Sequence, residues 1–574
     1  MQLIRRFRIP ALFCSLAVLV CELISRPYAN MGICDDGPYV LIAQKLAATG
    51  HIFYNGNTTP FLGWQVYLGA AFIKIFGFSF TSVRMSTLLV AATTAWLLQR
   101  TLVLAGINER NATVGTLALA LSPLYLMLSA TYMTDIFGLF AIVICLYGCL
   151  RALQAPTDRA TVGWLCFAVA TNALFGSARQ IAWLGVLVMA PSTLWLFRSR
   201  RRVFVAGAAV TFAGALFVLG CMLWFLHQPY NVHEPLIPST FPVRGALWRI
   251  SSDLLDIPFL LLPMVTLFLP ELGKARPRLI AVLLLLYLLV AVHPRHPPHQ
   301  VFLLEPTTGN WLTVYGLFPP FSHGGAPLFL HLWTQILLTV VSLGGLLGVA
   351  ASLLSRHRSP DALGRSSAIT WKQIGLLVVP FAIAYTLLLL PRAATVGIPY
   401  YAAADRYLLG LLVVALPCLV RYYQDQIRSR LPDASIFLVA IMAIYGVAAT
   451  HNMWALYRAR VVMAAELRAD GIPDTSVDNG WEYNFNVELQ HAGHLNDERI
   501  VIPAHAYVPT PPPAGKCLMW GYGETPHIHP LYGVSFDPNA CYGPAPFTPV
   551  HYSRWLASSP GTLYVVRYTP VSTH

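Results

Sequence analysis

Charged residues are scarce in this sequence of 574 residues. Asp, Glu, Lys and Arg together make up 11% of it, compared with roughly 25% in soluble domains. Hydrophobic residues make up 56%, and the mean hydropathy is +0.58. Apolar runs such as Leu279–Val292 and Ile374–Leu390 have no place in a soluble fold, because they approach the ~20 residues that cross a bilayer. The composition therefore predicts an integral membrane protein with many spans.

Several motifs of soluble enzymes are also absent. The sequence contains no Walker motif, no dinucleotide-binding Gly pattern, no Ser nucleophile elbow and no CxxC or Cys/His zinc spacing. The net charge of +13 falls mainly on short loops between apolar runs, which is typical of topology signals and argues against nucleic-acid binding. Most Cys residues lie inside apolar runs, where Cys packs as a small hydrophobe. Cys517 and Cys541 lie in the polar tail and could form a disulfide if the tail is outside the membrane.

The apolar runs predict thirteen spans. The charged Met1–Arg8 and the apolar run after it resemble a signal peptide, but no small-residue cleavage site is evident, so we interpret this segment as an uncleaved first span. With the N-terminus in the cytoplasm, the cytoplasmic loops carry more Lys and Arg than the outer loops, as the positive-inside rule requires. The predicted spans lie near 9–26, 82–103, 112–128, 133–152, 161–177, 180–197, 203–226, 254–270, 279–293, 333–354, 373–391, 406–420 and 434–450.

Two of the predicted outer segments are long enough to have structure of their own. In the first outer loop, about 27–81, the segments Gly37–Gly50 and Phe61–Phe76 are predicted to form helices that lie in the membrane interface. The tail is polar, rich in turn formers and contains a β-like run at Thr562–Tyr568, which predicts a small mixed α/β domain. The predicted domains are a transmembrane module, 1–450, and an extracytoplasmic C-terminal domain, 451–574.

Three acidic residues at the predicted outer face are candidate catalytic groups. Asp35 and Asp36 are adjacent, and repulsion between neighbouring carboxylates can raise the pKa of one of them, which suits a general base. The alternative is a solvated loop in which Asp36 lies near the N-cap of the next helix. Asp135 lies at the outer end of a predicted span, where a carboxylate is costly without a role or a partner. It could instead cap the helix that follows.

Basic residues in the predicted outer turns are candidate ligands of a lipid phosphate. The positive-inside rule predicts few basic residues in outer loops, but three arginines lie there: Arg179, Arg392 and Arg406, the last followed by Tyr407. A guanidinium matches phosphate geometry and keeps its charge in a dry site. The alternatives are contacts with lipid headgroups and, for Arg406, an ion pair with Asp405.

A metal site is the less favoured interpretation of two histidine-containing segments. Prolines prevent the first from presenting a helical ligand face, and metal sites usually include a carboxylate or Cys. We therefore predict solvated loops, although a nearby Glu keeps the metal alternative open, and the second segment could also contact an acceptor. The residues are His293, His296 and His299 with Glu305, and Glu524, His527 and His529 in the tail.

The first two hundred residues contain short motifs in a distinctive order. These are Asp35–Tyr39 (DDGPY), Ala43–Leu46 (AQKL), Gly50–His51, Ile73–Gly77 (IKIFG), Ser82–Arg84 (SVR), Leu121–Tyr125 (LSPLY) and Thr134–Asp135. In this order and spacing the chain resembles membrane glycosyltransferases of the GT-C class, and more closely glycosyltransferase family 39 and the aminoarabinose lipid A transferases. It departs from the family at Asn57–Phe61, where members often carry a Glu-Lys pair that supplies a phosphate ligand.

The resemblance implies roles for the candidate residues. The first-loop acid of the family is the catalytic base, a role that falls on Asp36 or Asp35, with Asp36 preferred because it directly precedes the Gly-x-Tyr that opens the helix. The second acid corresponds to Asp135, which organises the site. Basic residues of later outer loops hold the lipid phosphate, which matches Arg179 and Arg406.

The sequence therefore predicts an all-α polytopic membrane protein of GT-C type with an extracytoplasmic α/β domain, in the bacterial inner membrane. Its expected activity is sugar transfer, with inversion, from a polyprenyl-phosphate donor to an envelope glycolipid, polysaccharide or protein. No redox cofactor is required, and a divalent metal is compatible with the chemistry but not needed. The alternative function is a transporter or flippase for a lipid-linked substrate, although transporters tend to place ionisable groups near the bilayer midplane.

Overall fold

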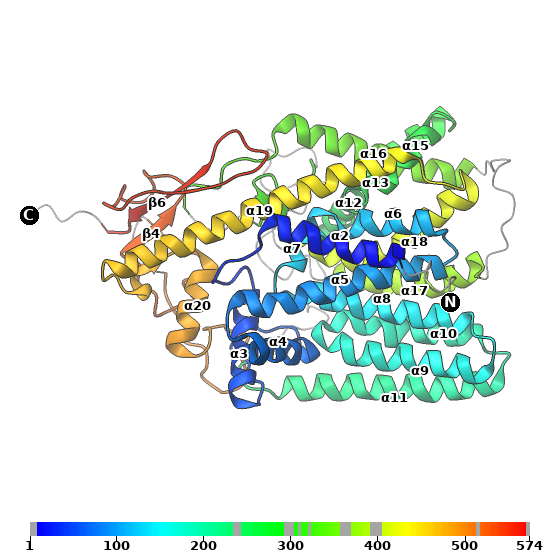
Figure 1. Ribbon diagram of the computed structural model, residues 1–574, viewed down its shortest axis with the longest axis horizontal. Helices are drawn as coiled ribbons and strands as arrows, with labels where there is room; N and C mark the ends of the chain where they lie inside the picture. The colour runs from blue at the N-terminus through cyan, green and yellow to red at the C-terminus, as the bar shows by residue number, and fades with distance from the viewer. Residues whose placement is uncertain are drawn as a thin grey trace, which may run out of the picture.

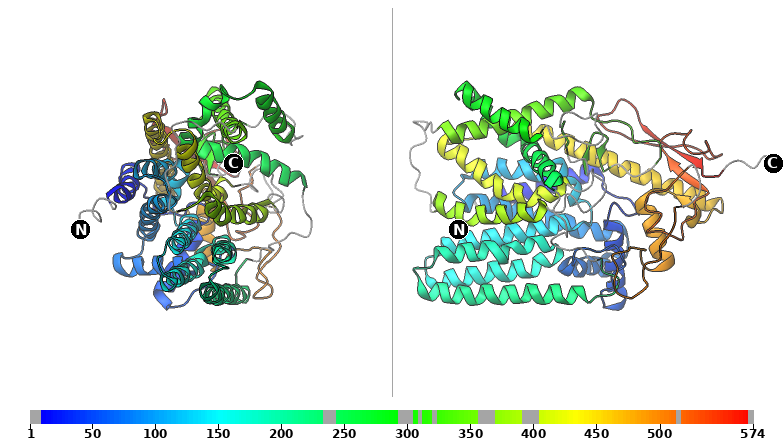
Figure 2. Two further views of the ribbon diagram at one scale, coloured as in Figure 1. Left: turned by 90° about the vertical axis from the view of Figure 1, so that its right-hand side faces the viewer. Right: turned by 180° about the vertical axis from the view of Figure 1, so that it is seen from behind.

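The computed structural model is mostly helical, and its long helices lie side by side along the longest axis of the molecule (Figure 1). Strands from the C-terminal part of the chain lie at one end of this helical bundle, and the further views show the same arrangement (Figure 2). The structure describes residues 9–232, 243–291, 304–307, 311–318, 323–355, 369–390, 404–512 and 517–569.

Eight helices of the described residues are long and apolar enough to cross a membrane. Several have side chains such as Leu223 and Leu337 exposed on the surface, which is expected of helices that face lipid. The helices are α5 (Phe80–Leu104), α8 (Thr134–Leu153), α9 (Asp158–Phe175), α11 (Arg201–Leu226), α16 (Leu332–Ser355), α17 (Trp371–Leu389), α18 (Leu409–Gln426) and α19 (Asp433–Ala469).

Two bent helix pairs raise the number of candidate spans to ten. One bends by 68° where Ser122 caps the second helix and Pro123, which has no N–H to donate, begins it. Each predicted span falls on a helix, on a bent pair or on a shorter apolar helix, but the count of thirteen crossings stays a prediction. The pairs are α6 (Glu109–Ala120) with α7 (Pro123–Ser129), and Ser252–Leu260 with Leu262–Leu272; the shorter helices are α2 (Ile9–Ser25), Gln180–Leu196 and Pro277–Leu289.

The two helices predicted in the first outer loop are confirmed as α3 (Asp36–Thr49) and α4 (Gly63–Phe76). In Figure 1, α3 runs across the direction of the long helices. The start of α4 packs closely against the turn after α9, since a Cβ on Gly63 would come within 1.9 Å of the Ser177 hydroxyl. This contact fixes the first outer loop against the bundle, while its place at a membrane interface stays a prediction.

The C-terminal part of the chain forms the predicted mixed α/β domain. Helix α19 runs through the expected boundary at 450 and carries the chain from the bundle into this domain (Figure 1). The domain contains α20 (Trp481–Ala492) and a four-stranded sheet with the order β3-β4-β6-β5, in which β3 and β4 are parallel and the other pairs antiparallel. The disulfide considered between Cys517 and Cys541 is present. The strands are β3 (Val477–Asp478), β4 (Tyr532–Ser535), β5 (Val550–Tyr552) and β6 (Gly561–Arg567).

A buried ion pair joins α19 to α20. The Nη2 atom of Arg460 lies 3.1 Å from Oε2 of Glu482, and neither side chain is exposed to solvent. Arg460 also donates to the backbone carbonyl of Asn479, and the Tyr457 hydroxyl donates to the other oxygen of Glu482. Removal of one partner would leave a buried charge without compensation, which is far more costly than loss of a surface pair.

We therefore expect Glu482→Ala to lower the free energy of unfolding by about 3–5 kcal/mol. The measurement is thermal unfolding of the detergent-solubilised protein. The matched control is Arg468→Ala on α19, the helix of Arg460, because Arg468 is 60% exposed and pairs with Asp474 at the surface. Its expected cost is about 0–1 kcal/mol, so equal shifts in Tm for the two variants would contradict this account.

Candidate active site

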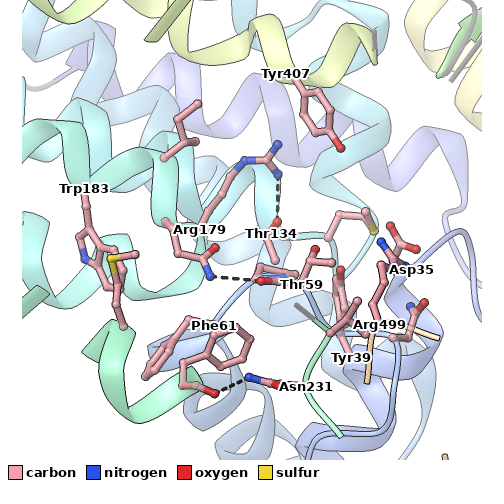
Figure 3. Close-up of a pocket in the computed structure, with 18 of the residues that line it drawn as sticks. Asp35, Tyr39, Thr59, Phe61, Thr134, Arg179, Trp183, Asn231, Tyr407 and Arg499 are labelled. Carbon is pink, nitrogen blue, oxygen red and sulfur yellow. Dashed lines mark hydrogen bonds between the residues drawn. The ribbon is translucent and has the colours of Figure 1, made fainter. Parts of the chain in front are cut away.

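A cavity of about 630 Å³ lies where the first outer loop, the ends of several long helices and the C-terminal domain meet (Figure 3). One part of it is apolar, with side chains from the turn after α9 and from α11 and α17. The other part is ionic. The apolar residues include Trp183, Leu184, Leu187, Val218, Met222, Phe225, Leu226, Leu388 and Leu389, and the ionic residues are Asp35, Arg179, Arg406, Asp497, Arg499 and Glu524.

Asp36 is buried away from this cavity and is fully engaged. Its two oxygens accept hydrogen bonds from the guanidinium of Arg84 at 2.8 and 2.9 Å, and the side chain has no exposed surface. Backbone N–H groups of Ile33 and Tyr132 donate to the same carboxylate at 2.6 and 3.1 Å. A carboxylate with four such donors and no access to the cavity is suited to holding the first outer loop in place.

Asp35, in contrast, lines the cavity (Figure 3). It occupies the N-cap position of α3 but makes no side-chain capping bond, so its carboxylate is available to the cavity. Its Oδ2 lies 3.5 Å from Nη2 of Arg406 and accepts a weak hydrogen bond from the Cys34 thiol at 3.7 Å. Of these two adjacent carboxylates, Asp35 lines the cavity and Asp36 does not, while the choice of Asp36 as the base stays a prediction.

Asp135 and Arg179 are close neighbours, although they lie far apart in the sequence. Nη1 of Arg179 is 2.8 Å from Oδ1 of Asp135 and donates to the Thr134 hydroxyl at 2.9 Å. Nη1 of Arg406 lies 3.8 Å from the other oxygen of Asp135, whose side chain is 1% exposed. Asp135 is therefore placed between the two guanidinium groups, which share a single carboxylate at this point.

Tyr407 stacks against both arginines. Its ring centroid lies 5.1 Å from the guanidinium carbon of Arg179 and 5.3 Å from that of Arg406, within the range of a cation–π interaction. The neighbouring Asp405 is buried and accepts hydrogen bonds from the backbone N–H groups of Leu312 at 2.6 Å and of Arg406 at 2.7 Å. These contacts fix the start of the short helix η7 (Asp405–Leu408) and so the position of Arg406.

Several other sequence candidates lie outside the described residues, namely Arg392, His293, His296 and His299. Among the described residues, the group with metal-ligand geometry is His323 with Cys517 and Cys541, and both Cys belong to the disulfide.

The C-terminal domain supplies three ionic residues that line the cavity, namely Asp497, Arg499 and Glu524. The sequence predicts an ordinary loop for Glu524, with an acceptor contact or a metal contact as the alternative. No sequence motif marks Asp497 and Arg499. They approach the cavity because the C-terminal domain packs against the first outer loop. There, the backbone N–H of Leu495 donates to the carbonyl of Asn55 at 2.9 Å.

No protein-family model and no curated protein sequence matches the chain, whereas several solved structures do. ArnT from Cupriavidus metallidurans in the apo state is 16% identical, covers 96% of this chain and 97% of its own, and has a TM-score of 0.41. The Archaeoglobus fulgidus oligosaccharyltransferase is 16% identical over 89% of this chain and 63% of its own, with a TM-score of 0.41.

The S. cerevisiae protein O-mannosyltransferase Pmt1-Pmt2 complex bound to the sugar donor is 15% identical over 38% of this chain, with a TM-score of 0.31. The match spans 33% of that yeast chain. At these identities and TM-scores the likeness by itself assigns no activity.

Proposed function

We propose that this protein is a glycosyltransferase of the inner membrane that moves a sugar from a polyprenyl-phosphate donor to an acceptor on the outer face. The observation that supports the proposal is the composition of one cavity. It combines an apolar section, a pair of guanidinium groups and an accessible carboxylate, which match the lipid, the phosphate and the acceptor proton of this reaction.

The arginine pair suits a phosphate leaving group. Arg179 and Arg406 share the carboxylate of Asp135, and Arg406 also lies 3.5 Å from Asp35, so ion pairs hold both guanidinium groups in fixed positions at the cavity. When the bond between the sugar and the phosphate breaks, negative charge grows on the phosphate oxygens. Fixed guanidinium donors stabilise that charge more strongly in a site sheltered from water than they would in solution.

Asp35 is the proposed general base. The acceptor oxygen attacks the anomeric carbon, its proton passes to Asp35, and the polyprenyl phosphate departs with the bonding electrons. A single displacement of this kind inverts the anomeric centre. The step requires no redox cofactor, and a divalent cation is compatible with it but not required, since Arg179 and Arg406 can carry the charge.

The apolar section is the proposed place for the start of the lipid chain. Its lining includes Val218 and Met222 of α11, and Leu388 and Leu389 at the end of α17. Burial of a lipid chain against such side chains is favourable by about 25 cal/mol per Å². An apolar chain therefore orients the phosphate towards the arginines.

The proposal is tested with the purified protein in proteoliposomes. Radiolabelled polyprenyl-phosphate hexose and aminopentose serve as donors, and a heat-treated envelope extract supplies the acceptor. We expect label to move from the lipid to the extract with at least one donor, and incubation with EDTA reports on metal dependence. Label that crosses the bilayer while remaining on its lipid would instead support a flippase and overturn the proposal.

A further inference from the structure

One wall of the cavity comes from the C-terminal domain and has no role in the donor chemistry described above. It is formed by residues of α20 and of the loops that follow it. Figure 3 draws Arg499 on the side of Asp35 and Tyr39, with Trp183 on the other side of the cavity. The residues of this wall, here called the domain wall, are Trp481, Phe485, Leu495, Asp497, Arg499 and Glu524.

The domain wall is held in place by backbone hydrogen bonds to other parts of the chain. Leu495 donates to Asn55 of the first outer loop at 2.9 Å, and Tyr230, just after α11, donates to Ile502 at 2.6 Å. Within the domain, Asn496 donates to the backbone carbonyl of Glu524 at 3.0 Å. These bonds connect the wall to both the first outer loop and the bundle, as a preorganised binding surface requires.

The charge of the domain wall differs from that of the arginine pair. Nε and Nη2 of Arg499 lie 2.9 and 2.6 Å from the two oxygens of Asp497, so this guanidinium is already neutralised. Glu524 adds a second carboxyl group. Burial raises the pKa of Glu524, as does the neighbouring Asp497, while Arg499 lowers it. The wall therefore presents two carboxyl groups to one guanidinium, whereas at the donor end the two guanidinium groups are matched by the two carboxylates of Asp135 and Asp35.

An aromatic surface accompanies these polar groups. Trp481 is half-buried, lines the cavity, and packs edge-to-face on Phe485 with 4.9 Å between the ring centroids. A flat ring offers apolar contact area at low entropic cost, and a few fixed polar groups beside it supply orientation. Carboxylates accept hydrogen bonds from hydroxyl groups and a guanidinium donates to hydroxyl oxygens. A sugar ring, with its hydroxyl rim and C–H faces, fits this combination.

We propose that the domain wall binds the acceptor and that the acceptor is a neutral saccharide whose hydroxyl oxygen attacks the donor. The inference rests on the proposed glycosyltransferase function and names the class of its acceptor. The hydroxyl oxygen bonds to the anomeric carbon, the hydroxyl proton goes to Asp35, and the bond from that carbon to the phosphate oxygen breaks. A phosphate acceptor is disfavoured, because it would place its negative charge beside the carboxyl groups of Glu524 and Asp497, and like charges at short distance repel.

The chemical stability of the labelled product tests the class of acceptor even while the acceptor molecule itself is unidentified. After transfer to the heat-treated extract, unreacted donor is removed and the product is treated with mild acid or with mild alkali. A glycoside of a saccharide keeps its label under both conditions, which is the expected result. Release by mild acid indicates a sugar phosphate, and release by alkaline β-elimination indicates a Ser- or Thr-linked sugar on protein; either would overturn the inference.

A second measurement assigns the binding to the domain wall. We expect Glu524→Gln and Trp481→Ala each to raise the amount of extract needed for half-maximal rate by roughly tenfold, with no change in the donor KM. The matched control is Glu498→Gln, because Glu498 is exposed next to the wall and does not line the cavity. Folded variants with an unchanged requirement for extract would overturn the inference. Absence of transfer by the wild-type protein would instead contradict the proposed function itself.

Discussion

Replacement of Asp35 by Asn lowers the rate of sugar transfer by about 10²–10⁴-fold, the usual contribution of a general base. The side chain keeps its size and loses the ability to accept a proton. Because Asp35 is 20% exposed and its one ion-pair distance, to Arg406, is 3.5 Å, the variant should fold and unfold like the wild type. The measurements are the initial rate of label transfer and Tm in detergent.

The neighbouring variant Asp36→Asn provides the comparison. The loss of its charge removes the buried ion pair with Arg84 and leaves that guanidinium uncompensated, at a cost of about 3–5 kcal/mol. We expect poor recovery of folded protein and a clearly lower Tm. A stable Asp36→Asn variant without activity, beside an active Asp35→Asn variant, would show that Asp36 is the base and that the geometry of the first outer loop changes on substrate binding.

The difference between these two residues shows where sequence reasoning reaches its limit. Two adjacent carboxylates at the start of a helix are equivalent in hydropathy, spacing and charge, so the sequence identifies the pair. It does not reveal that Arg84, 48 positions later, together with the backbone of Ile33 and Tyr132, surrounds one of them. Arg84, the residue that pairs with Asp36, lies on α5. It meets Asp36 only because of the way α5 packs against α3, and the sequence alone does not show that packing.

Local signals did predict the helices well. Apolar runs place the long helices, and the two helices of the first outer loop follow from amphipathic spacing and from Gly at their ends. Asp135 and Arg179 were each singled out because an ionised group at a span end needs a partner. The structure shows that these two residues form an ion pair with each other, at 2.8 Å. The place of either residue in the sequence does not reveal that pairing.

Two residues of the domain wall, in contrast, could not be predicted from local sequence signals. Asp497 and Arg499 are two positions apart on an irregular segment, and such spacing in a polar tail is typical of a solvated loop. Their place in the cavity depends on contacts such as that of Leu495 with Asn55, which join segments more than four hundred residues apart. No periodicity in the sequence encodes this docking, so the position of Asp497 and Arg499 in the cavity is evident only in the folded chain.

Replacement of Arg406 by Ala is expected to lower the rate of transfer by about 10²–10³-fold, as removal of one fixed donor to a developing oxyanion does. Arg406 lies within 4 Å of Asp35 and of Asp135, so its guanidinium connects the proposed base to the proposed phosphate site. Arg406→Lys should recover only part of the rate, because an ammonium group lacks the planar pair of parallel N–H donors with which a guanidinium binds two oxygens of one phosphate. Arg468→Ala, which is exposed and does not line the cavity, is the matched control and should retain full activity.

The donor dependence of the same variants separates binding from catalysis. If Arg406 binds the phosphate equally well before and during bond cleavage, Arg406→Ala raises the donor KM and leaves kcat unchanged. If its contribution grows as charge develops on the leaving phosphate, kcat falls as well. We expect the fall in kcat, since Asp135 and Asp35 already offset the charge of the arginine pair in the ground state, and fixed donors contribute most when the leaving phosphate carries its full charge. A normal rate with Arg406→Ala and a folded protein would place the phosphate elsewhere in the cavity.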